Sequence, residues 1–85
     1  MPILDVRTAD EARVGMIRGA RLVADDELAR RLAELPRDQR IVIHCGTGVR
    51  AAMAYHLLAD AGYNAVFFNG TVSFDKDGAL VLAPR

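Results

Sequence analysis

The sequence predicts an α/β fold, an open parallel sheet with helices on both faces. Short apolar runs that suit buried strands alternate along the chain with stretches whose apolar residues recur at helical spacing. The apolar run 41–43 leads into a glycine-containing loop and then into the helix-favouring series 50–59. Helical crossovers are the usual connections between parallel strands. We therefore expect one domain over residues 1–85, in which the residues that follow the strands meet at one edge of the sheet.

The chain begins with a strand and a short helical turn. Residues 3–6 form an apolar run suited to a buried strand. Thr8 and Glu11 fit the capping-box pattern, in which each side chain accepts a hydrogen bond from the other residue's backbone N–H at a helix start. Gly15 breaks this turn, and residues 20–23 can form a second brief strand.

The middle of the chain continues the alternation. The next helix is capped by Asp25 or Asp26 and ends at Pro36. Its apolar face repeats at helical spacing: Leu28, Leu32 and Leu35. Residues 41–44 then form a buried strand, the following helix stops at Gly62, and residues 65–68 form the last clear strand.

The loop after the central strand carries the chemistry. Cys45 is the only cysteine, and it opens a loop that leads to a helix N-terminus, where free N–H groups and the helix dipole favour negative charge. This setting favours the thiolate of Cys45, which is the nucleophilic form of cysteine. Arg50 closes the loop with a planar fork of donors suited to an anion. Because arginine in a first helical turn opposes the helix dipole, Arg50 calls for an anionic counterpart.

The spacing within this loop resembles that of a known family. Cysteine phosphatases have five residues between the His-Cys pair and Arg, whereas only four separate Cys45 from Arg50. The shorter ring suits a single sulfur atom better than a phosphoryl group. Cys45, Gly48 and Arg50 match the six-residue active loop of the rhodanese-like sulfurtransferases, and three further segments resemble family motifs in the same order: Leu4–Arg7, Gly15–Ala20 and Asn69–Phe74.

The resemblance implies a fold and an activity. It implies the rhodanese-like α/β fold and a sulfurtransferase that moves a sulfane sulfur through a persulfide on Cys45, with neither metal nor organic cofactor. The donor is a small sulfur compound, thiosulfate or a persulfide, and the acceptor is cyanide or a thiol, which a protein can carry. Two alternatives stay open: a low-turnover sulfur-carrier or binding module that serves a partner enzyme, and a cysteine phosphatase or arsenate reductase, which His44, Cys45 and Arg50 alone suggest.

Each residue of the predicted site has a role. We expect Cys45 to be catalytic and the rest of the loop to bind substrate: Gly46, Thr47, Gly48, Val49 and Arg50. Asp5 and Arg7, in the family's Asp-x-Arg signature, are expected to support the site. His44 should point away from Cys45, because neighbours on a strand alternate between faces. Thr47 could serve an anion or only the turn, and Gly70 is expected to permit a turn.

Two departures from the family pattern bear on the donor. Gly46 stands where members that use thiosulfate often have Arg, and Met16 replaces the usual His. The loop therefore lacks one charge that would hold a dianionic donor such as thiosulfate. The small size of the domain leaves little wall around the pocket, which favours a protein-borne or bulky donor or acceptor.

The C-terminal segment allows two structures. With Phe74 in the place of the family's Trp, residues 71–77 are expected to form a short helix ended by Gly78. The alternative is a hairpin that turns at Asp77-Gly78 and has residues 79–82 as its second strand. The family pattern favours the helix.

Composition excludes several other classes. Eleven basic and eleven acidic side chains cancel, so we expect no nucleic-acid or membrane partner. A single cysteine forms no internal disulfide and no structural zinc site. The first residues lack the basic start and apolar stretch of a secretory signal, so a cytoplasmic location is expected.

Overall fold

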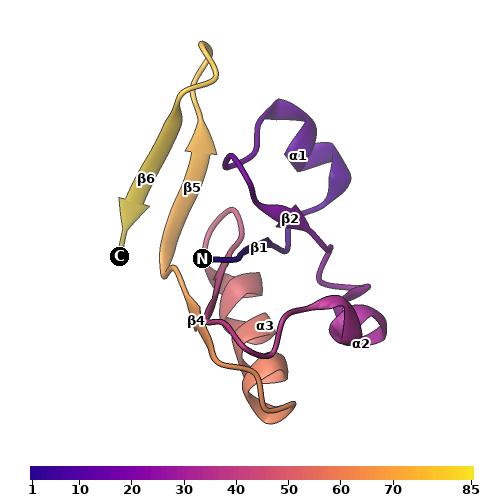
Figure 1. Cartoon of the computed structure of the whole chain (residues 1–85). Helices are drawn as coiled ribbons and strands as arrows, with labels where there is room; N and C mark the ends of the chain where they lie inside the picture. The colour runs from indigo at the N-terminus through magenta and orange to yellow at the C-terminus, as the bar shows by residue number, and fades with distance from the viewer.

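Four parallel strands form the central sheet of the protein, whose computed structural model describes residues 1–85 (Figure 1). The strands are β1 (Ile3–Asp5), β2 (Arg21–Leu22), β3 (Ile41–His44) and β4 (Ala65–Phe67), in the spatial order β2-β1-β3-β4. All neighbouring pairs are parallel. The four predicted strands and the α/β class are confirmed, with differences of a residue or two at the strand ends.

The helices are α1 (Ala9–Val14), α2 (Leu28–Arg31) with the following 3₁₀ turn η1 (Leu32–Glu34), and α3 (Val49–Asp60). The capping box is present, since Thr8 and Glu11 each accept the other's backbone N–H. Gly62 ends α3 with a φ of +88°, and the N–H of Tyr63 donates to the carbonyl of Leu58, as in a Schellman motif. No helix combines the length and apolarity needed to cross a membrane.

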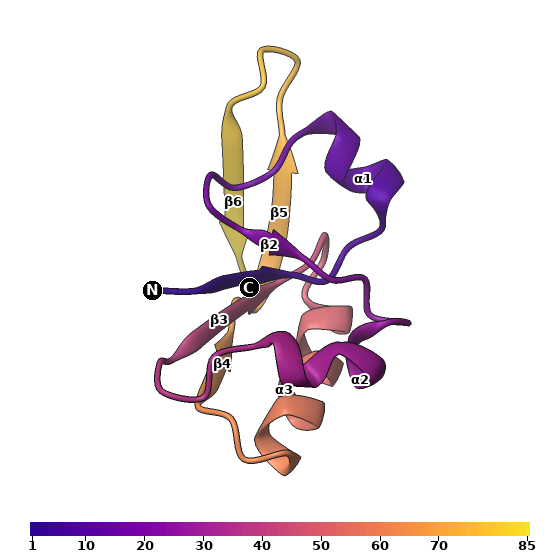
Figure 2. The same cartoon turned by 45° about the vertical axis from the view of Figure 1, so that its right-hand side comes forward.

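The two faces of the sheet are covered differently. Helices α2 and α3 lie on one side of the sheet, whereas α1 and a β-hairpin lie on the other (Figures 1 and 2). Side chains along β3 point to the two faces in turn: Ile41 and Ile43 belong to the core under the helices, and Val42 and His44 line a cavity of about 300 Å³ on the hairpin side. On the helix side, the core cluster includes residues of α2, of α3 and of the segments that follow them: Leu28, Leu35, Ala51, Ala54, Leu58 and Tyr63.

The C-terminal segment is a hairpin, so the expected helix over residues 71–77 is wrong. Strands β5 (Gly70–Phe74) and β6 (Leu80–Pro84) pair antiparallel, with Val72 opposite Leu82. The turn is stabilised by Asp75, whose carboxylate accepts the N–H groups of Asp77 and Ala79. Gly78 supplies the left-handed backbone, with a φ of +82°. The alternation of buried and exposed residues in β5 fits a strand and would not fit one face of a helix.

Candidate active site

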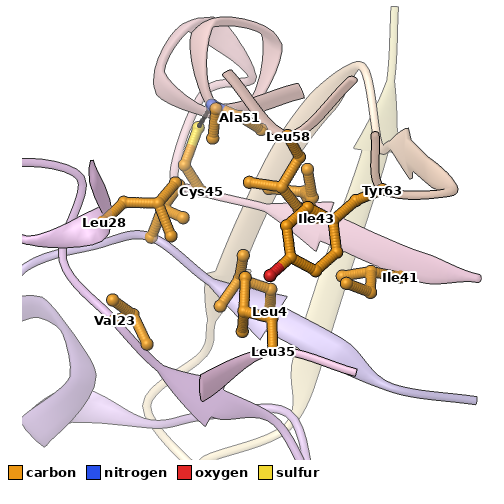
Figure 3. Close-up of a cluster of buried hydrophobic side chains, with 12 residues drawn as sticks. Leu4, Val23, Leu28, Leu35, Ile41, Ile43, Cys45, Ala51, Leu58 and Tyr63 are labelled. Atoms are coloured by element: carbon orange, nitrogen blue, oxygen red, sulfur yellow. Dashed lines mark hydrogen bonds between the residues drawn. The ribbon is translucent and has the colours of Figure 1, made fainter. Parts of the chain in front are cut away.

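The sulfur of Cys45 lies against the backbone amides that begin α3. The N–H of Gly48 donates to Sγ at an N–S distance of 3.0 Å, and the N–H of Ala51 donates at 3.3 Å. Figure 3 shows the second of these bonds at the edge of the core cluster. Both N–H groups belong to the helix start, where backbone donors have no carbonyl partner within the helix. Two preorganised donors therefore converge on the one nucleophilic atom of the loop and stabilise negative charge there.

The other side of Cys45 is apolar. The residue is only 1% exposed and packs in the core cluster that includes Leu28 and Ile43 (Figure 3). The side chain is thus buried, but its sulfur has amide hydrogens as partners. A donor or acceptor reaches this sulfur only when neighbouring groups move.

The loop is braced by the hairpin. The N–H of Val72 donates to the carbonyl of Gly46 at 2.9 Å, and the guanidinium of Arg85 donates to the carbonyl of Thr47 at 2.7 Å. Gly48 has a φ of +102°, and a Cβ at this position would lie 3.1 Å from the backbone nitrogen of Gly70. Gly70 thus does more than permit a turn: its backbone closely approaches the loop. The expectation that the segment after β4 meets the loop after β3 is confirmed.

Arg50 does not present a free fork to solvent. Its two terminal nitrogens bind the two carboxylate oxygens of Glu11, at 2.6 Å and 2.9 Å. These hydrogen bonds lower the pKa of Glu11 to about 2 and raise the pKa of Arg50 above its ordinary value. The anionic counterpart that the sequence predicts for Arg50 is therefore the carboxylate of Glu11, on α1.

Asp5 and Arg7 form a buried ion pair beneath α1. Both are nearly inaccessible, at 0% and 4% exposed, and Nε and Nη2 of Arg7 bind the carboxylate at 2.8 to 3.1 Å. Nη2 of Arg7 also donates to the carbonyl of Gly15 at 2.8 Å, just beyond the end of α1. The pair ties α1 to the end of β1. Since α1 carries Glu11, the signature residues support the position of the Glu11–Arg50 pair.

His44 faces the other side of the sheet from Cys45, as predicted. It is 2% exposed, its Nε2 has no hydrogen-bond partner, and this atom lies 3.8 Å from the carboxylate of Asp5. Burial lowers the pKa of His44, and the charge of Asp5 opposes this shift in part. His44 is therefore not placed to act as a base toward the Cys45 sulfur.

The structure brings the whole predicted loop together, although its members differ in exposure. Gly48 is buried beside the sulfur, whereas the Thr47 and Val49 side chains face solvent. Sequence reasoning missed two residues, Ala51 and Glu11. The contribution of Ala51 is a backbone N–H, for which no side-chain signal exists, and the capping box already accounted for Glu11 locally. No group of three His, Cys, Asp or Glu side chains is arranged to hold a metal ion.

We expect Gly48→Ala to slow sulfur chemistry at Cys45 at least about tenfold. A non-glycine residue in left-handed backbone costs about 1–3 kcal/mol, and the close contact with Gly70 forces the loop to shift, which moves an N–H away from Sγ. The measurement is the rate of sulfur uptake by intact mass. Gly19→Ala is the matched control, because Gly19 has a φ of +83° but nothing within 4 Å of an added Cβ. Equal rates in the two variants would contradict the role of Gly48.

Comparison with known proteins shows the family of the chain. A family model described as a rhodanese-like domain matches residues 1–73. The chain belongs to the rhodanese-like family. A protein named sulfurtransferase from Allochromatium vinosum is 31% identical over 85 residues, which are 98% of this chain and 79% of the relative. The family assignment that the loop spacing suggested is confirmed.

Solved structures agree with the assignment. The crystal structure of a rhodanese-like domain protein from Staphylococcus aureus matches with a TM-score of 0.80 and 32% identity, over 84% of this chain and 70% of that one. A NAD-dependent persulfide reductase from A. fulgidus matches with a TM-score of 0.72 and 34% identity, over 82% of this chain but 13% of that one. At the level of the family, the chain is a rhodanese-like domain.

Proposed function

We propose that the protein transfers a sulfane sulfur through a persulfide on Cys45. The observation that carries this proposal is the pair of N–H donors, from Gly48 and Ala51, that converge on Sγ of the only cysteine. The sulfurtransferase name of the Allochromatium vinosum relative and the persulfide chemistry in the name of the A. fulgidus protein support it.

The first step loads the sulfur. The Cys45 thiolate attacks the outer sulfur of a donor, which is thiosulfate or a persulfide. A bond forms between Sγ and that sulfur, the bond between the donor's two sulfurs breaks, and its electron pair leaves with sulfite or with a thiolate. The amides of Gly48 and Ala51 stabilise the negative charge on the sulfur, as preorganised dipoles do for other anions.

The second step transfers the sulfur from Cys45 to the acceptor. A thiolate or cyanide attacks the outer sulfur of the Cys45 persulfide, and the electron pair of the broken S–S bond returns to Sγ as the thiolate. The cycle needs no external oxidant or reductant, because the sulfane sulfur is passed on at constant oxidation state. A protein thiol fits the acceptor role as well as a small thiol does.

Intact mass spectrometry tests the proposal. The protein is incubated with thiosulfate and, separately, with an organic persulfide, and is then weighed. We expect a gain of one sulfur atom that dithiothreitol removes and that cyanide releases as thiocyanate. Absence of the gain with both donors would overturn the proposal.

A second function, sulfur carriage for a partner enzyme, is favoured by the burial of Cys45 and by exposed apolar side chains at the start of α3. Val49 is 56% exposed and Met53 is 68% exposed, next to a loop that must move to admit a substrate. A carrier would exchange sulfur slowly with small molecules and rapidly with its partner. Steady-state turnover with cyanide that matches the loading rate would exclude this alternative.

A further inference from the structure

Arg50, at the mouth of the loop, belongs to an ion pair with no net charge. Both terminal nitrogens of Arg50 are taken by Glu11, and Glu11 is itself held by the N–H and hydroxyl of Thr8, at 3.1 Å and 3.2 Å. The pKa of Glu11 is lowered to about 2, chiefly by its hydrogen bond with Arg50, so the carboxylate is charged at neutral pH. The charge of Asp25 also acts on Arg50.

This ion pair sits directly on the loop. A Cβ at Gly46, the residue after the catalytic cysteine, would lie 3.3 Å from Nη2 of Arg50 and 3.3 Å from a carboxylate oxygen of Glu11. The exposed guanidinium of Arg85 donates to the carbonyl of Thr47, a neutral acceptor. A dianion that approaches Cys45 therefore finds the guanidinium of Arg50 already paired. It also meets two carboxylates close to that guanidinium, those of Glu11 and Asp25.

An apolar cavity adjoins Arg50. It has a volume of about 250 Å³ and lies between the start of α2 and one side of α3. Its lining is Asp25, Leu28, Arg50, Met53, Ala54 and Leu57. Leu28 belongs both to this lining and to the core cluster that contains Cys45. Cys45 is not part of this lining, and the cavity reaches the cluster of the nucleophile through Leu28. Its mostly apolar wall suits an apolar group better than a sulfonate.

We infer that Glu11 determines the donor: by pairing with Arg50 it directs the site toward organic persulfides with an uncharged, apolar body and away from thiosulfate. The inference rests on the sulfur transfer proposed above. With such a donor, Cys45–S⁻ and R–S–SH give Cys45–S–SH and R–S⁻, so the leaving group is a thiolate whose apolar part lies in the cavity. Glu11 acts through Arg50 and is a positioning residue.

The test compares Glu11→Gln with Asp10→Asn for two donors, thiosulfate and benzyl persulfide. Glutamine preserves the capping box, and both variants lose one carboxylate from the first turn of α1. Asp10 pairs only with the exposed Arg13. The readout is the second-order rate constant for sulfur loading, by intact mass, for each donor. A purely structural effect would slow both donors together, so the ratio of the two constants is decisive.

We expect the unmodified protein to prefer benzyl persulfide. Glu11→Gln should raise the ratio of thiosulfate to benzyl persulfide loading at least about tenfold, because it frees a cation at close range. Added salt should reduce that gain. Asp10→Asn should leave the ratio within about twofold. If Glu11→Gln and Asp10→Asn give the same ratio, the role of Glu11 is refuted while sulfur transfer stands. If no donor loads the unmodified protein, both proposals fail.

Discussion

Replacing Cys45 by serine is expected to abolish sulfur uptake from every donor while the fold is retained. The serine hydroxyl occupies nearly the same space as the thiol and can accept the N–H groups of Gly48 and Ala51 in its place. An alcohol oxygen does not form the S–S bond that the mechanism requires. We expect no gain of sulfur by intact mass, against stoichiometric loading of the unmodified protein.

The free energy of unfolding of the Cys45→Ser variant serves as the control that the variant is folded. A polar substitution that keeps hydrogen-bond partners in the core should cost about 1–2 kcal/mol, which leaves a two-state urea transition to be measured. Sulfur retained by the folded serine variant would place the acceptor atom elsewhere. Since Cys45 is the only cysteine, that result would remove the persulfide mechanism altogether.

Asp5→Ala is expected to lower the free energy of unfolding by about 3–5 kcal/mol, because it leaves the buried charge of Arg7 without its partner. Arg7 is 4% exposed, so water cannot replace the carboxylate. The same change removes the acceptor of the Arg7 backbone N–H, which binds Asp5 at 3.0 Å. This loss is a large part of the free energy of unfolding expected for an 85-residue domain.

Urea unfolding of Asp5→Ala and Asp10→Ala measures this difference. Asp10 also pairs with an arginine, but both side chains of that pair are mostly exposed. Its loss should cost less than about 1 kcal/mol. Asp5→Asn keeps the shape and an acceptor and should fall between the two. Similar midpoints for the Asp5 and Asp10 variants would mean that the signature pair does not hold α1 in place.

Most of the scaffold could be predicted because its signals are local. The apolar run 41–43 and the glycine at 62 fix where β3 begins and α3 ends, and Thr8 with Glu11 fixes the start of α1. The spacing from Cys45 to Arg50 was sufficient to indicate the family. Each of these signals lies within a few residues of the structure that it specifies.

The structure differs from expectation in the C-terminal segment, and it contains a long-range pair that the sequence does not signal. The family's Trp position favours a C-terminal helix, whereas the alternation in Thr71–Phe74 and the Asp77-Gly78 turn are local evidence for the observed hairpin. Phe74 packs over Gly15, where a Cβ would lie 2.7 Å from its ring. Likewise, the bond from Glu11 to Arg50 spans 39 positions. A contact between residues so far apart in the chain leaves no periodic pattern in the sequence.

The central claim, that backbone N–H groups hold the charged sulfur on Cys45, is tested most directly by removing one of them. Ligation at Cys45 gives access to a chain in which Ala51 is replaced by lactic acid, so that an ester oxygen stands in place of the N–H that donates to Sγ. The control carries the ester at Val49, whose N–H does not bind the sulfur. We predict that the ester at position 51 slows sulfur loading about tenfold or more, with the control within about threefold of the all-amide protein. Equal loading rates for the two esters would contradict the account.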